Sequence, residues 1–378
     1  MKRIYLDYNA TAPLRPEALE AFHWALARDA GNPSSVHTGG RAARALVDEA
    51  RERVAAALEV REEDVVFTSG GTEGLNLAIR GAMRRLPRGS SLVCARTEHA
   101  AALGACAQAA EEGAAQTMLE VNALGQIQVE EHRTDLSAAQ LVVASSANGE
   151  TGTLHDLSAL RSTMDATKDR AILCVDGVQS LGREPLNWLK NCADLAVFSA
   201  HKVGGPQGVG VLWRRGGVSL EPLAFGGGQE GELRPGTENV AAIHAASVAI
   251  ELAVNELSTE ASRQRSLLAT CWRSLLEAVP GVQLNGLPPE DPRRLPNTLN
   301  VALPRTEGRI LVTRLDLEGL AVSAGSACAS GSLEASHVLL AMGQSEERAR
   351  AGLRISLGRG SSEQDIHATV DILRKTIR

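Results

Sequence analysis

Between about residue 41 and residue 215, segments with helical periodicity alternate with short apolar runs that end in glycine or polar residues. From Arg41 to Leu58, apolar residues recur every three or four positions and charged residues occupy the opposite face, which predicts an amphipathic helix. The apolar runs lack strict alternation, as is typical of strands buried on both faces. We therefore expect βα units around a mostly parallel sheet, with strands at 65–67, 92–94, 141–144, 172–175 and 195–198.

The pattern changes after about residue 240. Two long helical segments run to about Ala278, and a proline-rich stretch at 288–296 marks a boundary. A smaller α+β unit follows. Its predicted elements are strands at 297–303 and 353–357, a helix at 310–317 and a final amphipathic helix at 363–377.

Composition and charge exclude several classes of protein. The chain has 378 residues, of which 44% are hydrophobic and 22% charged, so it can bury a substantial core. Its net charge of −6, with acidic and basic residues intermixed, disfavours a nucleic-acid-binding protein. The chain lacks a run of roughly 18 apolar residues for a membrane span, and it reaches Asp7 before any apolar signal core. We expect a cytoplasmic protein that acts on a small molecule, without membrane or direct nucleic-acid partners.

Polar residues follow several of the predicted strands. Ligands of open α/β sheets bind beyond the carboxyl ends of the strands, where Lys202, Asp176 and Gln179 would lie. The turn Gly70-Gly71-Thr72 precedes a predicted helix, whose N-terminal amides can bind a phosphate. Taken singly, a glycine-rich turn is most often only a turn or a helix cap, and a lysine in a loop is most often only exposed to solvent. Together, a lysine, a carboxylate and a phosphate cradle meet the needs of pyridoxal 5′-phosphate (PLP). The candidate lining comprises residues 69–72, 145–148, 176–179 and 199–202.

The six cysteines are scattered and include no C-x-x-C pair, which argues against a disulfide framework or a cysteine-rich metal site. Cys328 lies among small residues from Ser323 to Gly331, a composition typical of an exposed loop in which a thiol can react. Arg354 could pair with a carboxylate, although a surface salt bridge is the commoner fate of an arginine. We expect the remaining cysteines to pack in the core: Cys94, Cys106, Cys174, Cys192 and Cys271.

A series of motifs that spans nearly the whole chain resembles the class V aminotransferase family, and within it the NifS/IscS-like cysteine desulfurases. Individually several motifs are weak, but their order is specific. The sequence departs from the motifs of this family at few positions, one of which is Gly177, where alanine is common in the family. The motifs are Tyr5–Thr11, Gly31–His37, Phe67–Glu73, Thr97–His99, Asn148–Gly152, Val175–Ser180, Ser199–Lys202, Arg234–Asn239, the Cys328 loop and Leu353–Gly358.

The resemblance implies fold type I of PLP enzymes, an α/β fold with a mostly parallel seven-stranded sheet and a smaller α+β domain. The large, PLP-binding domain would comprise residues 15–255, and the small domain residues 1–14 and 256–378, including the Cys328 loop. The implied reaction converts L-cysteine to L-alanine, with the sulfur held as a persulfide on Cys328. A homodimer is implied, as is a sulfur-acceptor protein such as an iron–sulfur scaffold. The sequence does not reveal which acceptor or pathway receives the sulfur.

The resemblance also implies a role for each site residue. Lys202 would form the Schiff base with PLP, His99 would stack over its ring, and either could carry protons. Asp176 would face the ring nitrogen and Gln179 the phenolic oxygen. The phosphate would be held by Gly71, Thr72, Ser199 and His201, together with Thr237 from the neighbouring subunit. Asn148, which is also assigned to the cofactor site, and Arg354 would bind the substrate carboxylate, and Cys328 would accept the sulfur.

Other activities remain open at this point. A selenocysteine lyase or a plain aminotransferase would use the same fold, although an aminotransferase has no need for the loop cysteine. A PLP-free binding or scaffold protein is a further alternative. The presence of Lys202, Asp176, His99 and Gln179 speaks against it.

Overall fold

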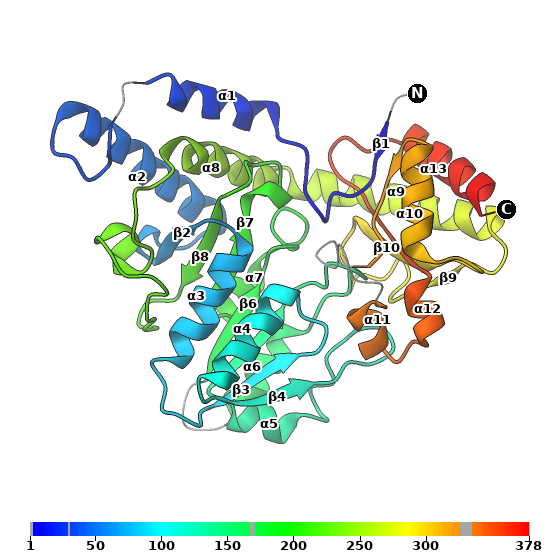
Figure 1. Cartoon of the computed structure of the whole chain (residues 1–378), viewed down its shortest axis with the longest axis horizontal. Helices are drawn as coiled ribbons and strands as arrows, with labels where there is room; N and C mark the ends of the chain where they lie inside the picture. Colours follow the sequence, from blue (N-terminus) through cyan, green and yellow to red (C-terminus); the bar gives the residue numbers. More distant parts are fainter. Residues whose placement is uncertain (1–2, 29–30, 167–170, 326–334, 378) are drawn as a thin grey trace.

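The computed structural model describes residues 3–28, 31–166, 171–325 and 335–377. A seven-stranded sheet forms the centre of the larger part of the molecule (Figure 1). Strand β8 (Gly210–Arg214) pairs antiparallel with both of its neighbours, and all the other pairs in the sheet are parallel. The strand order is β2 (Val65–Thr68), β8, β7 (Leu195–Ser199), β6 (Ile172–Asp176), β5 (Leu141–Ser145), β3 (Ser91–Ala95) and β4 (Ala115–Leu119).

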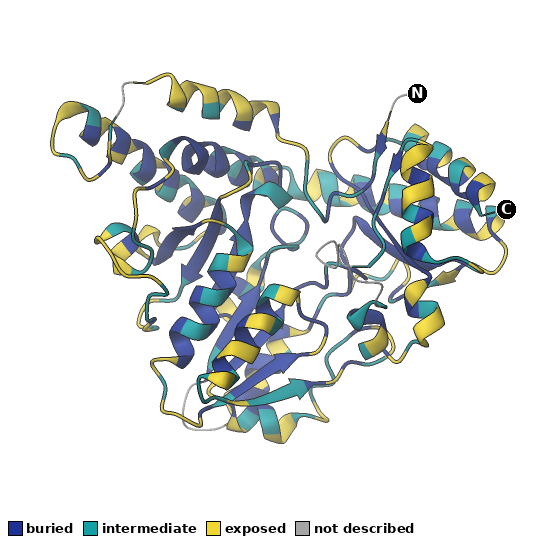
Figure 2. Ribbon diagram, viewed as in Figure 1, coloured by how far each residue is buried: buried dark blue, intermediate teal, exposed yellow. Residues whose placement is uncertain are grey.

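Helices cover both faces of this sheet, and two hydrophobic clusters fill the space between the layers. One cluster joins the sheet to α2 (Thr38–Leu58), α6 (Leu157–Met164) and α8 (Val240–Asn255). The other joins the opposite face to α3 (Gly71–Met83) and α4 (Ala100–Glu111). The central strands are buried throughout, as Figure 2 shows, which explains why their sequences lack alternation.

The smaller part of the molecule is built on a three-stranded antiparallel sheet with its own hydrophobic cluster. The order of this sheet is β12 (Gly352–Ser356), β10 (Thr298–Ala302) and β9 (Gln283–Leu284). Helices α9 (Leu257–Ala278), α10 (Gly308–Leu317) and α13 (Glu363–Thr376) pack on it. Two short helices, α11 (His337–Ala341) and α12 (Glu346–Arg350), lie before β12. The assignment of residues 15–255 to a large domain, and of residues 1–14 and 256–378 to a small one, stays a prediction.

The N-terminal segment runs along this smaller sheet and then reaches the larger one. Strand β1 (Ile4–Tyr5) pairs in parallel with β11 (Leu320–Ala321), and Asp7 forms a bridge with Ser356 of β12. The amide of Ala12 donates a hydrogen bond to the carbonyl of His201, just after β7. Residues 4–12 therefore connect the two sheets beside the carboxyl end of β7.

The predicted strands and helices are present, and the predicted α/β architecture is confirmed. Apart from the buried strand β8, the elements that the pattern did not predict are short or exposed. Helix α1 (Pro16–Leu26) buries only Ala18 among its residues and appears largely exposed in Figure 2. Strand β4 and the short helices α5 (Arg133–Ala138) and α7 (Asn187–Asn191) were also missed.

Two expectations concern whole-chain properties. All five cysteines expected to pack in the core are buried with free thiols. Among the described residues, no single helix is long and apolar enough to cross a membrane, and the pair α8 and α9 passes that test only together, bent by 69°.

Candidate active site

A cavity of about 280 Å³ lies where β5, β6 and β7 end. The carboxyl ends of these parallel strands meet at one edge of the sheet, so the residues that follow them converge. The structure brings together ten of the residues singled out in the sequence: Gly71, Thr72, His99, Asn148, Asp176, Gln179, Ser199, His201, Lys202 and Arg354.

Lys202 ends a single 3₁₀ turn, Ala200–Lys202, directly after β7. Its Nζ donates hydrogen bonds to the carbonyl oxygens of Asn9 and Ala10, both at 2.7 Å. The N-terminal segment thus holds the amine at the wall of the cavity. Sequence reasoning did not assign Asn9 or Ala10 to the site, because nothing in their local pattern shows that the N-terminal segment reaches β7.

Three buried carboxyl groups, Asp176, Glu98 and Glu150, also line the cavity. Oδ1 of Asp176 accepts a hydrogen bond from the amide of Val178 at 2.9 Å, and burial raises the pKa of Asp176, an effect that nearby His99 and Lys202 oppose. Glu98 accepts hydrogen bonds from the amide and hydroxyl of Ser145, at 2.8 and 3.0 Å. Burial, and then the charge of Asp176, raise the pKa of Glu98 to about 8. Glu98 is therefore largely protonated at neutral pH.

Two histidines of the site, His99 and His201, are neutral at pH 7. His99 precedes α4, and its Nδ1 accepts a hydrogen bond from the amide of Ala101 at 3.1 Å, so the ring proton is on Nε2. Desolvation lowers the pKa of His99, with Lys202 acting in the same direction. Desolvation, and then Lys202, lower the pKa of His201 to about 4, and its Nδ1 lies 3.1 Å from Oγ1 of Thr11. Neutral rings suit stacking and hydrogen bonding rather than ion pairing.

The N-terminus of α3 opens onto the cavity. Gly70 precedes the helix with a φ of +155° and, as the N-cap residue, has no side chain that could cap the helix amides. A Cβ at Gly71 would lie 3.0 Å from a methyl group of Val178, so a larger residue would crowd this end of the cavity. Uncapped amides at a helix N-terminus attract a phosphate, and the hydroxyls of Thr72 and Ser199 line the same cavity. With the amine of Lys202 and the charge of Asp176, this donor set fits PLP.

Arg354 of β12 reaches the cavity from the smaller sheet. Its Nη2 forms an ion pair with Asp7 at 2.8 Å, and its Nη1 donates to the carbonyl of Gly149 at 3.2 Å. Its Nε is buried and has no hydrogen-bond partner among the described residues. The side-chain Nδ2 of Asn148 donates a hydrogen bond to the carbonyl of Thr97 at 3.0 Å. The guanidinium therefore retains donors for a carboxylate, whereas the side chain of Asn148 chiefly shapes the wall.

Two predicted residues are not placed at the cavity. Thr237 is exposed and does not line it; its hydroxyl lies 3.5 Å from the amide nitrogen of Asn32. Cys328 lies outside the described residues. The residues on either side are described: Ser323 donates a hydrogen bond to Asp7 at 2.9 Å, and His337 lines the cavity and lies 3.0 Å from the carbonyl of Glu98.

The departure at Gly177 has a local cause. A Cβ on this residue would lie 2.5 Å from Cε1 of Phe198 and 3.0 Å from the ring of Trp188. The two aromatic rings stack on each other with centroids 6.2 Å apart. Glycine therefore follows Asp176 because aromatic side chains fill the space of a methyl group.

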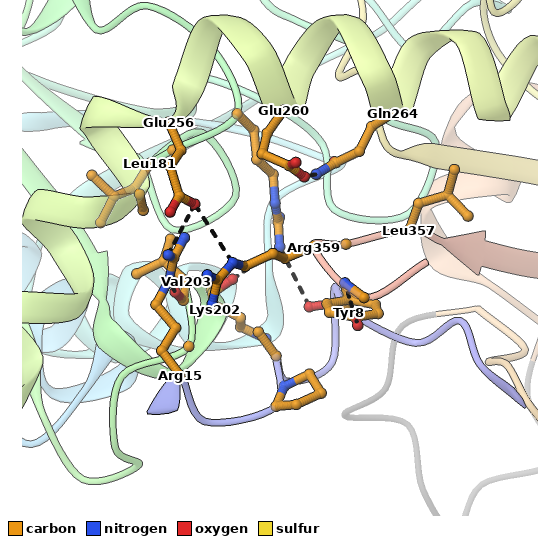
Figure 3. A pocket seen from close by; sticks show the side chains of 18 of the residues that line it. Tyr8, Arg15, Leu181, Lys202, Val203, Glu256, Glu260, Gln264, Leu357 and Arg359 are labelled. Atoms are coloured by element: carbon orange, nitrogen blue, oxygen red, sulfur yellow. Dashed lines mark hydrogen bonds and ion pairs between the residues drawn. The ribbon is translucent and has the colours of Figure 1, made fainter. Parts of the chain in front are cut away.

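A second cavity, of about 360 Å³, is also lined by Lys202 (Figure 3). It is lined by the N-terminal segment, the start of α9 and the loop after β12. Glu256 forms an ion pair with Arg15 at 2.9 Å and faces Arg359 at 3.9 Å, as the dashed lines in Figure 3 mark. Lys202 thus forms part of the wall of both cavities.

Comparisons with known proteins agree with this geometry. The model of the family described as aminotransferase class-V matches residues 4–369. The cysteine desulfurase IscS of Dictyoglomus turgidum is 39% identical over 382 residues, covering 100% of this chain and 95% of that protein.

Two solved structures have a fold similar to that of this chain. A NifS-like protein superimposes with a TM-score of 0.91 at 32% identity, covering 99% of this chain and 98% of that one. SspA in complex with cysteine superimposes with a TM-score of 0.78 at 29% identity, covering 93% and 98% of the two chains. These likenesses confirm the predicted fold class.

Proposed function

Because the chain belongs to the class V aminotransferase family, we propose that it is a PLP-dependent cysteine desulfurase that converts L-cysteine to L-alanine. The observation that carries the proposal is the convergence of Lys202, Asp176, His99 and Gln179 in one cavity, beside the uncapped N-terminus of α3. A lysine, a buried carboxylate and a phosphate cradle are the groups that a PLP enzyme requires.

Each of these residues has a task that suits its surroundings. Bound PLP supplies an electron sink for the negative charge that develops at Cα of an amino acid. Lys202 would bind the cofactor through its amine and, once released as a neutral amine, remove the Cα proton. Asp176 would favour the protonated ring nitrogen, because an opposite charge stabilises the charged form. His99, being neutral, would stack on the ring.

The substrate and the sulfur involve residues from the smaller sheet and the loop. Arg354 would bind the carboxylate of L-cysteine, since its guanidinium faces the cavity with unused donors. Cys328, as a thiolate, would attack the sulfur atom of the substrate and form the S–S bond of a persulfide as the Cβ–S bond of the substrate breaks. The electron pair of that bond would stay with the three-carbon skeleton, which takes up protons and leaves as L-alanine. The positions of Ser323 and His337 beside the cavity support this role, because they flank the segment that carries Cys328.

Partners of two kinds belong to the proposal. A homodimer would bring Thr237 of one subunit to the phosphate of the other, in keeping with its distance from the cavity of its own chain. Large apolar side chains exposed near α1 and α2, namely Trp24, Leu26 and Val36, support a contact surface there. The persulfide would pass to an acceptor protein, with iron–sulfur cluster assembly as the destination that the IscS name of the relative suggests. We place these steps in the cytoplasm.

The test is an assay of the purified protein with PLP, L-cysteine and a reductant. We expect L-alanine and sulfide in equal amounts. The keto acid of cysteine, 3-mercaptopyruvate, formed with a keto-acid acceptor and without sulfide, would indicate an aminotransferase, and activity with selenocysteine alone would indicate a lyase for that substrate. Lys202→Ala should lose the yellow colour of the lysine-bound cofactor. Cys328→Ser should keep the colour and lose sulfide release. A colourless protein that does not take up PLP would contradict the proposal.

A further inference from the structure

Arg183 is a buried cation whose hydrogen bonds all go to neutral acceptors. It follows β6 and is 8% exposed. Burial, and then the charge of Arg354, lower the pKa of Arg183 to about 9. Among the described residues, no carboxylate forms an ion pair with it. Burying a charge without a counter-charge costs free energy. This cost suggests that Arg183 has a function besides stabilising the fold.

The guanidinium of Arg183 connects three segments around Lys202. Its Nη1 donates to the side-chain oxygen of Gln179 and, at 3.2 Å, to the backbone carbonyl of the same residue. Its Nη2 donates to the carbonyl of Lys202 at 3.2 Å and to that of Tyr8 at 3.3 Å. One side chain therefore holds the turn after β6, the backbone of Lys202 and the N-terminal segment.

These contacts fix the orientation of the Gln179 amide. A guanidinium can only donate hydrogen bonds, so the amide oxygen must face Arg183 and the NH₂ group must face the other way. There Nε2 donates to the carbonyl of Asn9 at 3.1 Å, at the wall of the first cavity. Gly149 leaves the amide little room, since a Cβ there would lie 3.1 Å from Gln179.

We propose that Arg183 is a positioning residue that presents the N–H groups of Gln179 to the cofactor, anchors the backbone of Lys202 and places a positive charge behind both. The inference rests on the proposed binding of PLP at Lys202. An N–H donor at Gln179 suits the anionic phenolic oxygen of the cofactor, and a cation behind it favours that anion. Arg183 also lines the second cavity, from which its guanidinium can be reached.

The test uses Arg183→Met, which removes the charge and the donors, and Arg183→Lys, which keeps the charge. The two measurements are the dissociation constant of PLP and the pH midpoint of the visible absorbance of the lysine-bound cofactor. The other charged or titratable groups around the cofactor site are the same in every variant, namely Asp176, Glu98, Glu150, His99, His201, His337, Lys202, Arg354 and Asp7.

For Arg183→Met we expect the dissociation constant to rise about tenfold, the loss of one charged hydrogen bond. The pH midpoint should rise by about one unit, because loss of a nearby cation favours the protonated form of the bound cofactor. Arg183→Lys should keep the midpoint of the native protein and still bind PLP more weakly, since an ammonium cannot hold both Gln179 and Lys202. In Arg183→Ala, guanidinium ions at low concentration should enter from the second cavity and restore the midpoint, whereas urea should not.

Arg294→Met is the matched control. Arg294 is 1% exposed and likewise donates to backbone carbonyls, those of Leu287 and Thr298, but lines neither cavity. An unchanged midpoint and affinity in Arg183→Met, or equal shifts in Arg294→Met, would overturn the inference. If Arg183→Met does not fold, native PLP affinity in Arg183→Lys overturns it instead. Failure of the unaltered protein to bind PLP would refute the proposed function, a result distinct from all of these.

Discussion

Asp7 and Arg354 lie 347 positions apart in the sequence and form an ion pair of 2.8 Å at the active-site cavity. The pair is largely buried, with side-chain exposures of 18% and 4%. Asp7 also accepts a hydrogen bond from Ser323, at the start of the stretch that leads to Cys328. The carboxylate thus orients the arginine that we assign to the substrate and also holds Ser323, five residues before the proposed nucleophile Cys328.

Substitution of Asp7 should therefore affect binding of L-cysteine more than the chemical step. In Asp7→Asn, Arg354 loses its charged partner and its fixed orientation, and we expect the KM for L-cysteine to rise about tenfold, as for one charged hydrogen bond. The change in kcat should be small by comparison. Steady-state kinetics of alanine formation measure both constants.

Asp316→Asn is the control for that experiment. Asp316 pairs with Arg3 in an exposed ion pair away from the cavity, and such pairs contribute little. We expect native kinetics from this variant. A KM for Asp7→Asn equal to that of the control would show that Asp7 does not orient Arg354 for the substrate.

The relationship between these two residues also shows what the sequence could predict. Lys202, Asp176 and Gln179 were found because parallel strands end at one edge of a sheet, and the order of βα units indicates which residues follow them. The pairing of Asp7 with Arg354, and of Lys202 with Asn9, depends on how the N-terminal segment packs between two sheets. Local periodicity carries no signal of such a long-range contact.

The same reasoning explains the elements that were missed. β8 is an antiparallel strand inserted between β2 and β7. A run of apolar residues does not indicate whether its strand pairs in parallel or antiparallel. Glu98 lies within the motif Thr97–His99. Its buried position and its hydrogen bonds with Ser145 follow from the pairing of β5 with its neighbours, not from the local sequence of the motif. The position of Cys328 lies outside the described residues, so its role stays a prediction.

The crowding at Gly71 predicts the effect of added volume at the phosphate end of the cavity. In Gly71→Ala, the new methyl group would lie 3.0 Å from Val178, and the first turn of α3 must shift to relieve the contact. We expect weaker binding of PLP, measured as the dissociation constant, with folding intact. Gly104→Ala in α4 is the matched control, because a Cβ there has no neighbour within 4 Å. It should bind PLP normally and gain about 0.5–1 kcal/mol of stability from helix propensity; equal PLP affinity in both variants would contradict the prediction.

Ionisation of Glu98 predicts a pH dependence of stability in the PLP-free protein. Its pKa in the folded state is raised to about 8, above the ordinary glutamate value. Between those two values the unfolded chain has lost the proton and the folded protein still holds it, so stability falls as pH rises. In Glu98→Gln the hydrogen bonds from Ser145 can be kept and this titration is absent. The melting temperature of the native protein should therefore fall more steeply from pH 5 to pH 8 than that of the variant. Parallel curves would show that Glu98 is not a buried, protonated acid.

The proposed homodimer predicts that defects in Lys202 and Thr237 complement each other. In a hybrid of a Lys202→Ala chain and a Thr237→Val chain, the site on the second chain has its own Lys202 and receives Thr237 from its partner. Hybrids isolated with two different affinity tags should then regain up to about half of the native activity, because one of two symmetric sites is intact. Each variant alone, as a homodimer, should show the defect of its own substitution in both sites. If Thr237 acted within its own chain, the hybrid would contain no intact site, and its activity would not exceed the average of the two parent variants.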